Sequence, residues 1–271
     1  MEEVRPPSRD GLFSRADRPR IITISGANKD IGKSSLVAYL VSHCRDCSAM
    51  KVTLHEERPP GEAVLEEKEP DGNGADTARM LAAGASPVFW IRTTVDGLAA
   101  DLREAFSRSQ ASLVIVEGNS VLEHLEPDFA VFIMGSGFED FKPSAFKAIE
   151  KAHTIVVNGE RRLSGAEVLA LEKKIKAMSP RAKMVVVFEL GRERAWEIVL
   201  SRAAGRVGGE LMSGEIDEKV MEAVKARAEE GRIACAVALK LAEELKVPTG
   251  EVGKAANALD VKIVKCSLGC F

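Results

Sequence analysis

The chain has 271 residues, and its 38 basic and 41 acidic side chains leave a formal net charge of −3. This length admits one large domain or one domain with an appendage, and a 45% share of hydrophobic residues is typical of a globular protein with a sizeable core. The acidic balance disfavours a general affinity for nucleic acid or for an anionic membrane surface. No apolar run reaches the roughly 20 residues that a membrane-spanning helix needs, and the segment 1–19 lacks the apolar centre of a signal peptide. We therefore expect a cytoplasmic protein with a disordered lead-in over residues 1–19.

From residue 20 to residue 188, apolar runs of strand length alternate with longer segments of helical periodicity. Most of these runs are continuously apolar, which is typical of strands covered on both faces. The alternation predicts right-handed crossovers and an α/β fold with a doubly wound, mostly parallel sheet. The predicted strands are 20–25, 49–54, 88–92, 112–116, 128–134, 154–157 and 184–188, and the predicted helices are 33–43, 75–83, 97–107, 142–151 and 166–178.

Two stretches interrupt the alternation. The acidic, proline- and glycine-containing segment 57–74 is interpreted as a surface loop, with a mobile lid as the alternative. Near 204–214 the pattern breaks at glycines, so we place a domain boundary near Gly208. This gives a first domain over 20–208 and a small all-helical domain over 209–271, with predicted helices at 217–228, 233–245 and 249–259.

The strongest chemical signal is the segment 26–35, Gly-Ala-Asn-Lys-Asp-Ile-Gly-Lys-Ser-Ser, which follows a predicted strand and opens a predicted helix. This is the context of a phosphate-binding loop, whose backbone N–H groups converge on phosphate oxygens at the positive end of a helix. The usual spacing is G-x4-G-K-[ST], whereas here Ala27 stands at the first glycine position and Gly26 lies one residue earlier. We expect Lys33 to reach the β- and γ-phosphates and Ser34 to ligate Mg²⁺. The predicted phosphate-binding residues are Asn28, Lys29, Asp30, Ile31, Gly32, Lys33, Ser34 and Ser35.

Two carboxylates are candidate partners of this loop. Glu117 ends the predicted strand of the segment Val-Ile-Val-Glu-Gly (114–118), at the edge where open α/β sheets bind ligands. It would hold Mg²⁺ directly or through water, and the alternative is a strand-terminal glutamate on the surface. Asp76 lies at the start of the predicted helix 75–83. It would orient a water or a metal in catalysis, or it would cap the helix.

Three segments together resemble the molybdopterin-guanine dinucleotide biosynthesis adaptor family, MobB. They are the loop 26–35, the segment 76–91 (DTARMLAAGASPVFWI) and the segment 114–118, so the match covers about the first 120 residues. The loop spacing and the Val-Glu-Gly ending are also similar to dethiobiotin synthetase. Both families belong to the dimer-forming P-loop class that includes the signal recognition particle GTPases and the MinD ATPases. The resemblance implies Mg-nucleotide binding, a role in molybdopterin-type cofactor assembly, and homodimerisation across the nucleotide face.

Several positions depart from these families. The guanine-reading motif N-K-x-D is absent, and its nearest analogue, 157–161, offers Asn158 for a purine edge without the acidic residue in its place. The expected preference for GTP over ATP therefore rests mostly on the resemblance. Asn28 stands where MinD ATPases carry their signature lysine, which disfavours that class. Asn119 follows Val-Glu-Gly where dethiobiotin synthetase has glycines, although Lys51 would matter in a synthetase.

The cysteines and one histidine leave alternatives open. Cys44 and Cys47 have metal-ligand spacing but no matching second pair. These two cysteines either ligate a metal or an Fe–S cluster or simply pack in the fold. The same two alternatives apply to Cys235, Cys266 and Cys270. His55, just after the predicted strand 49–54, is either a surface residue or a residue facing the site.

The segment 239–259 has helix-turn-helix character. Residues 215–271 carry nine Lys or Arg against ten Asp or Glu, so the basic footprint that DNA binding requires is missing. Docking of a protein partner is therefore favoured over DNA. The sequence predicts a slow, Mg-dependent NTPase that assists cofactor or metallocentre assembly. The alternatives are an ATP-dependent synthetase and a nucleotide-controlled switch that acts through the C-terminal helices.

Overall fold

The computed structural model divides the chain into two compact units, Met1–Leu211 and Met212–Phe271. Each unit is described by itself. The predicted lead-in 1–19 lies outside the described residues except for its last two, of which Arg18 pairs with Asp128 at 3.4 Å. The described residues are 18–44, 46–68, 76–138, 141–159, 161–208, 211, 218–229, 231–245, 247, 252–253, 255–256, 259 and 261–264.

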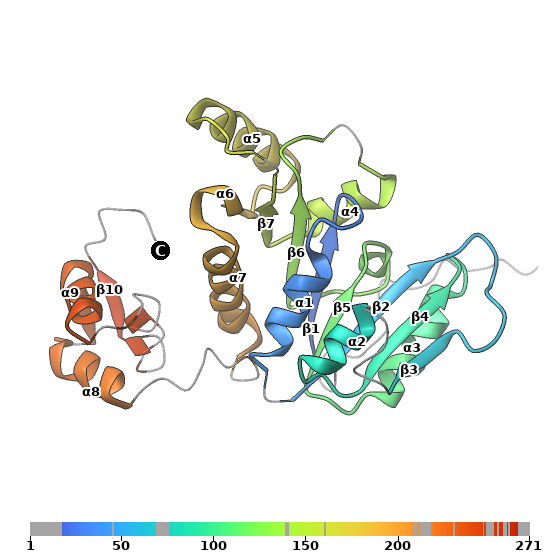
Figure 1. The fold of residues 1–271 in the computed structure, drawn as a ribbon, viewed down its shortest axis with the longest axis horizontal. Coiled ribbons are helices and arrows are strands. Elements are labelled where there is room, and N and C mark those ends of the chain that lie inside the picture. The colour runs from blue at the N-terminus through green and yellow to red at the C-terminus, as the bar shows by residue number, and fades with distance from the viewer. Residues whose placement is uncertain are drawn as a thin grey trace, which may run out of the picture. The chain divides into compact units, whose positions relative to one another are not determined.

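An eight-stranded sheet in the order β3-β4-β2-β5-β1-β6-β7-β8 forms the centre of the first unit (Figure 1). Every neighbouring pair is parallel except β3 and β4, which are antiparallel. The strands are β1 (Arg20–Gly26), β2 (Cys47–Leu54), β3 (Val64–Glu67), β4 (Val88–Thr93), β5 (Leu113–Glu117), β6 (Phe129–Met134), β7 (Thr154–Val157) and β8 (Lys183–Val186).

Helices cover both faces of this sheet because successive apolar strand residues point to opposite sides. One apolar cluster joins the sheet to α1, α2 and α7, and the other joins it to α3, α4 and α5. The predicted doubly wound, mostly parallel α/β fold is therefore confirmed. The helices are α1 (Lys33–Val41), α2 (Asp76–Ala82), α3 (Leu98–Arg108), the 3-10 helix η1 (Ser120–Glu123), α4 (Pro143–Lys151), α5 (Gly165–Met178), α6 (Val187–Leu190) and α7 (Arg192–Val207).

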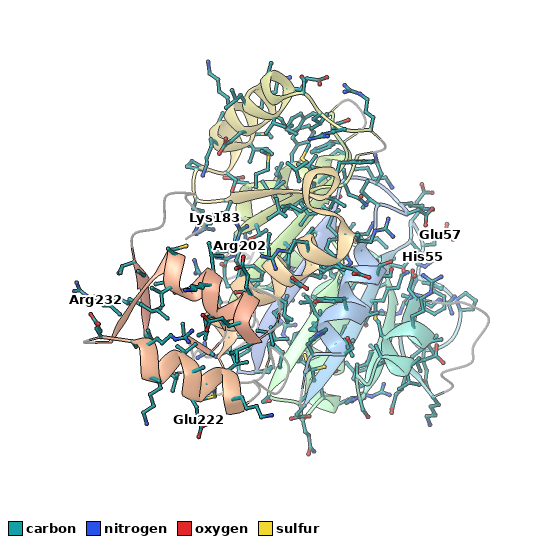
Figure 2. All side chains as sticks on the ribbon, turned by 60° about the vertical axis from the view of Figure 1, so that its left-hand side comes forward. His55, Glu57, Lys183, Arg202, Glu222 and Arg232 are labelled. Atoms are coloured by element: carbon teal, nitrogen blue, oxygen red, sulfur yellow. The ribbon has the colours of Figure 1, made fainter. Side chains whose placement is uncertain are left out.

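Two local predictions need correction, and one helix was not predicted. The segment 57–74 is not a loop throughout, because Val64–Glu67 pairs with β4 as an edge strand. The last predicted strand ends at Val186, where α6 begins. Helix α7 was not predicted, yet it contributes six buried residues to the core. Its Arg202 donates to the carbonyl oxygen of Lys183 at 3.5 Å (Figure 2), and burial lowers the pKa of this guanidinium.

The second unit contains α8 (Glu218–Arg227), β9 (Arg232–Ala234), α9 (Cys235–Leu245) and β10 (Lys262–Val264) around its own apolar cluster. Because β9 and β10 form a parallel pair, the prediction of an all-helical domain is wrong. Each strand has only three residues, and its partner strand lies about 30 positions away along the chain. Periodicity along the sequence therefore does not reveal this strand pair. Of the predicted helix 249–259, only residues 252–253, 255–256 and 259 are described. No helix among the described residues has the length and apolar character needed to cross a membrane.

Candidate functional site

A pocket of about 850 Å³ lies at the carboxyl ends of β1, β2 and β5, which is where open α/β sheets bind ligands. Its charged lining comprises five cationic side chains, Lys29, Lys33, Lys51, Arg79 and Lys142, and three acidic ones, Asp30, Asp76 and Glu117. This excess of positive charge favours an anionic ligand. The uncharged lining comprises Gly26, Ala27, Asn28, Gly32, Ser34, Ser35, Val52, Thr53, Leu54, Trp90, Gly118, Asn119, Ser120 and Ser144.

The loop between β1 and α1 presents the start of the helix to this pocket. Gly32 is the N-cap of α1 and has a φ of 104°, a left-handed conformation that glycine adopts without the steric cost of a Cβ. No side chain caps this end of α1, and its first turn carries no acidic residue. The N–H groups of the first turn are thus available to an anion and lie at the positive end of the helix dipole.

Lys33, the first residue of α1, is folded back over this loop. Its Nζ donates a hydrogen bond to the carbonyl oxygen of Asn28 at 2.6 Å. Burial lowers the pKa of Lys33, although the nearby charge of Glu117 opposes the change. A phosphate would offer this ammonium a stronger partner than a neutral carbonyl.

Ser34 and Glu117 bring together, beside Lys33, two oxygen atoms that can ligate a metal. The Ser34 hydroxyl donates to Glu117 Oε2 at 2.9 Å, and Glu117 at the end of β5 is only 5% exposed. Burial raises the pKa of Glu117, against the charge of Lys51 and the Ser34 hydrogen bond. A hydroxyl and a carboxylate are ligands that Mg²⁺ accepts, so this pair fits the metal of a nucleotide site.

Asp76 and Lys51 form an ion pair at the wall of the same pocket. Asp76 is the first residue of α2 and Lys51 lies on β2. Burial by itself would raise the pKa of Asp76, but the hydrogen bond and charge of Lys51 outweigh it, so that the pKa is lowered. Asp76 therefore stays ionised, and it also interacts with Ser34.

Asn119 is a site residue whose contact sequence reasoning missed. Its Oδ1 accepts from the Gly26 N–H at 2.9 Å, and its Nδ2 donates to the Gly26 carbonyl oxygen at 3.0 Å. The side-chain amide thus continues the strand pairing between β5 and β1 and fixes the start of the loop. The signal in the sequence was an amide residue directly after the strand-terminal Glu-Gly.

Two predicted nucleotide-site residues are absent from the pocket lining: Ile31 of the phosphate loop and Asn158, which was predicted for a purine edge. Asn158, which follows β7, donates from its Nδ2 to the carbonyl oxygen of Ile31 at 2.8 Å. It therefore contacts the loop from outside the pocket. His55 also does not line the pocket, and Figure 2 shows it beside Glu57 beyond the end of β2.

In the part of the chain that the structure describes, no group of three or more His, Cys, Asp or Glu side chains is arranged to bind a metal. Cys44 donates to the carbonyl oxygen of Leu40 at 3.3 Å, and Cys47 is buried in β2. Cys235 opens α9. Cys266 and Cys270 lie outside the described residues.

The strand–loop–helix unit at Gly26–Lys33, with a strand-terminal acid on the adjacent β5, decides the fold class. The unit has the arrangement of a phosphate-binding loop within a doubly wound α/β fold. No protein-family model and no curated protein matches the sequence.

Solved structures similar to this chain have low sequence identity to it. The hydrogenase maturation factor HypB from Archaeoglobus fulgidus is 16% identical, with 70% of this chain and 91% of that chain covered and a TM-score of 0.44. HypB from Helicobacter pylori, solved in complex with nickel, is 9% identical, with 73% and 91% covered and a TM-score of 0.43. The 54 kDa signal recognition particle protein from Aeropyrum pernix K1, solved with GDP, is 13% identical, with 93% and 79% covered and a TM-score of 0.37.

Proposed function

We propose that this protein binds a nucleoside triphosphate with Mg²⁺ in the loop Gly26–Lys33 and hydrolyses it slowly. The observation that carries the proposal is the contact of Ser34 with Glu117 at 2.9 Å. This contact supports the proposal because it joins a hydroxyl and a carboxylate near the ammonium of Lys33 and the uncapped start of α1. The phosphate chain would lie on the α1 N–H groups, with Ser34 and Glu117 holding the metal.

Each charged residue then has a distinct task. Lys33 leaves the Asn28 carbonyl and neutralises charge on the β- and γ-phosphates. Asp76, kept ionised by Lys51, orients the attacking water through a hydrogen bond. Bound Mg²⁺ would supply charge stabilisation at the phosphate oxygens. These tasks require positioning and electrostatics, which are the usual means of phosphoryl-transfer catalysis.

The finer parts of the proposal rest on the resemblance to the MobB family. We favour GTP over ATP, a role in molybdopterin-type cofactor or metallocentre assembly, a cytoplasmic location and a homodimer joined across the nucleotide face. The domain division near Gly208 is also part of the proposal, with residues 209–271 docking a protein partner rather than DNA.

One observation favours a second candidate, an ATP-dependent synthetase acting on a small acid. Lys51 lines the pocket next to Asp76, where an ammonium can contact a second anionic substrate. A synthetase would release phosphate only when its acid substrate is present. The proposed NTPase would release it slowly with nucleotide alone.

The experiment that tests the proposal is to identify the nucleotide and metal that copurify with the full chain, followed by calorimetric titration with MgGTP and MgATP. We expect one nucleotide per chain, and affinity that falls when Mg²⁺ is removed. Absence of binding for both nucleotides by folded protein would overturn the proposed function. Tighter binding of ATP than of GTP would overturn the preference for GTP alone.

A further inference from the structure

The pocket continues beyond the phosphate loop along a row of residues that the sheet holds in register. Glu117 on β5 pairs with Lys51 on β2, and Lys51 pairs with Trp90 on β4. Residues in register across parallel strands share one face, and the strands lie 4.7–4.9 Å apart, so Trp90 lies about 10 Å from Glu117. The row leads from the predicted metal ligand to an indole that still lines the pocket.

Trp90 is held in one orientation. Its Nε1 donates to Thr53 Oγ1 at 3.0 Å, and the guanidinium of Arg92 lies 5.2 Å from the ring centroid. The side chain is nevertheless 37% exposed, whereas its neighbours Phe89 and Ile91 are buried on the opposite face of β4. A fixed, half-exposed indole presents a rigid surface on which a planar ring stacks at little entropic cost.

Cationic and apolar side chains line the same pocket as this indole. Arg79 of α2 lines the pocket with 58% of its side chain exposed, and its distance to Asp76 is 3.7 Å. A guanidinium has five N–H donors, so Arg79 retains donors for a carboxylate or phosphate. Leu54, at the end of β2, is 36% exposed and adds an apolar wall.

We infer that this part of the pocket, formed by Lys51, Thr53, Leu54, Arg79 and Trp90, is a second subsite for a planar, anionic small molecule. The inference rests on the proposed function, because the loop Gly26–Lys33 takes the nucleotide and leaves this region for the second ligand. The ring of that ligand stacks on Trp90, and its carboxylate or phosphate meets Arg79 and Lys51. The whole pocket, which includes the phosphate loop, has a volume of about 850 Å³.

The test uses the full chain saturated with Mg²⁺ and a non-hydrolysable GTP or ATP analogue, whichever binds. Pterin-6-carboxylate, a planar anion, is titrated by calorimetry. Its comparison probes are 6-hydroxymethylpterin, which lacks the charge, and cyclohexanecarboxylate, which lacks the planar ring. We expect one pterin-6-carboxylate per chain, at least tenfold tighter binding than either comparison probe, and at least a tenfold loss in Trp90→Leu.

Phe146→Leu is the matched control, because Phe146 is 47% exposed on α4 and does not line the pocket. It should bind the probe as the parent does. If Trp90→Leu does not fold, Arg79→Met replaces it, since Arg79 lies mostly in solvent. That variant should lose the preference for pterin-6-carboxylate over 6-hydroxymethylpterin.

Two failures are distinguishable. If the parent binds nucleotide but not pterin-6-carboxylate, or if Trp90→Leu and Arg79→Met bind the probe as tightly as the parent, the subsite is wrong and the nucleotide function stands. If the parent binds neither MgGTP nor MgATP, the proposed function is wrong and the subsite inference, which rests on it, is overturned too.

Discussion

Lys33 donates a hydrogen bond to a neutral carbonyl, and burial lowers its pKa. Replacing it with alanine removes the ammonium that we place on the β- and γ-phosphates. We expect Lys33→Ala to abolish nucleotide binding in calorimetry. Stability should fall by only about 0.5–1.5 kcal/mol, the usual net value of one hydrogen bond.

Lys147→Ala is the control for that variant. Lys147 lies on α4 with 64% of its side chain exposed and pairs with Glu123, so its loss should change neither affinity nor stability measurably. Unchanged nucleotide affinity in a folded Lys33→Ala protein would contradict the assignment of the loop.

Glu117→Gln distinguishes the contribution of the metal from that of the phosphate contacts. Glutamine keeps the size of the side chain and removes the charge, so Mg²⁺-dependent hydrolysis should fall much more than Mg²⁺-free nucleotide binding. Hydrolysis assays with varied Mg²⁺, beside nucleotide titrations in EDTA, measure both quantities. Equal losses in the two assays would make Glu117 a structural residue.

Asn119 gives a prediction of a different kind, because it acts on the loop backbone. Asn119→Ala leaves the N–H and carbonyl of Gly26 without their side-chain partner, which costs about 1–3 kcal/mol. We expect lower stability in urea denaturation together with weaker nucleotide binding. Unchanged stability together with unchanged nucleotide affinity in Asn119→Ala would refute the role of this backbone contact.

At the scale of the elements, the sequence predicted the continuous apolar strands of the sheet because burial on both faces leaves an unmistakable composition. It missed the edge strand Val64–Glu67, which has only four residues and lies in an acidic segment. Helix α7 had a readable signal, with Ala195, Trp196 and Val199 on one buried face. The pairing of Lys51 with Asp76 was not readable, since it joins residues 25 positions apart.

Helix α5 carries the prediction about pH. Ser164 and Glu167 form a capping box at its start, and Arg161 pairs with Glu167. The hydrogen bond from Arg161 and those from Ser164 lower the pKa of Glu167 to about 2, below the roughly 4.3 of an unfolded chain. A depressed pKa stabilises the fold above the unfolded value, and this contribution is lost as the pH falls through the folded value.

The stability difference between the parent and Glu167→Gln should therefore be constant above about pH 5 and should shrink from about pH 4 towards pH 2. Thermal melting across this range measures it. Glu172→Gln, on the same helix but outside the capping box, is the control. A difference that stays constant down to pH 2 would contradict the role of the Glu167 charge.

At the scale of the whole molecule, the two units have separate apolar clusters. Residues such as Val220, Leu241 and Val252 form the core of the second unit, and the two clusters of the first unit contain no residue beyond Leu211. Each unit thus buries its own apolar surface, which is the physical basis of an independent domain.

A chain ending at Leu211 should consequently bind nucleotide as the full chain does, because every lining residue of the pocket lies before Glu160. Ending at Leu211 also keeps the bridge between that residue and Cys44. Calorimetry on the soluble truncated protein measures the affinity, and a loss beyond tenfold would show that the second unit contributes to the site.

The full chain should bind duplex DNA weakly and without sequence preference at physiological salt, since nearly balanced charge over residues 215–271 releases few counterions. A salt titration of DNA binding decides between a protein partner and DNA. Submicromolar, sequence-dependent binding with a steep salt slope would make the second unit a DNA-binding module under nucleotide control.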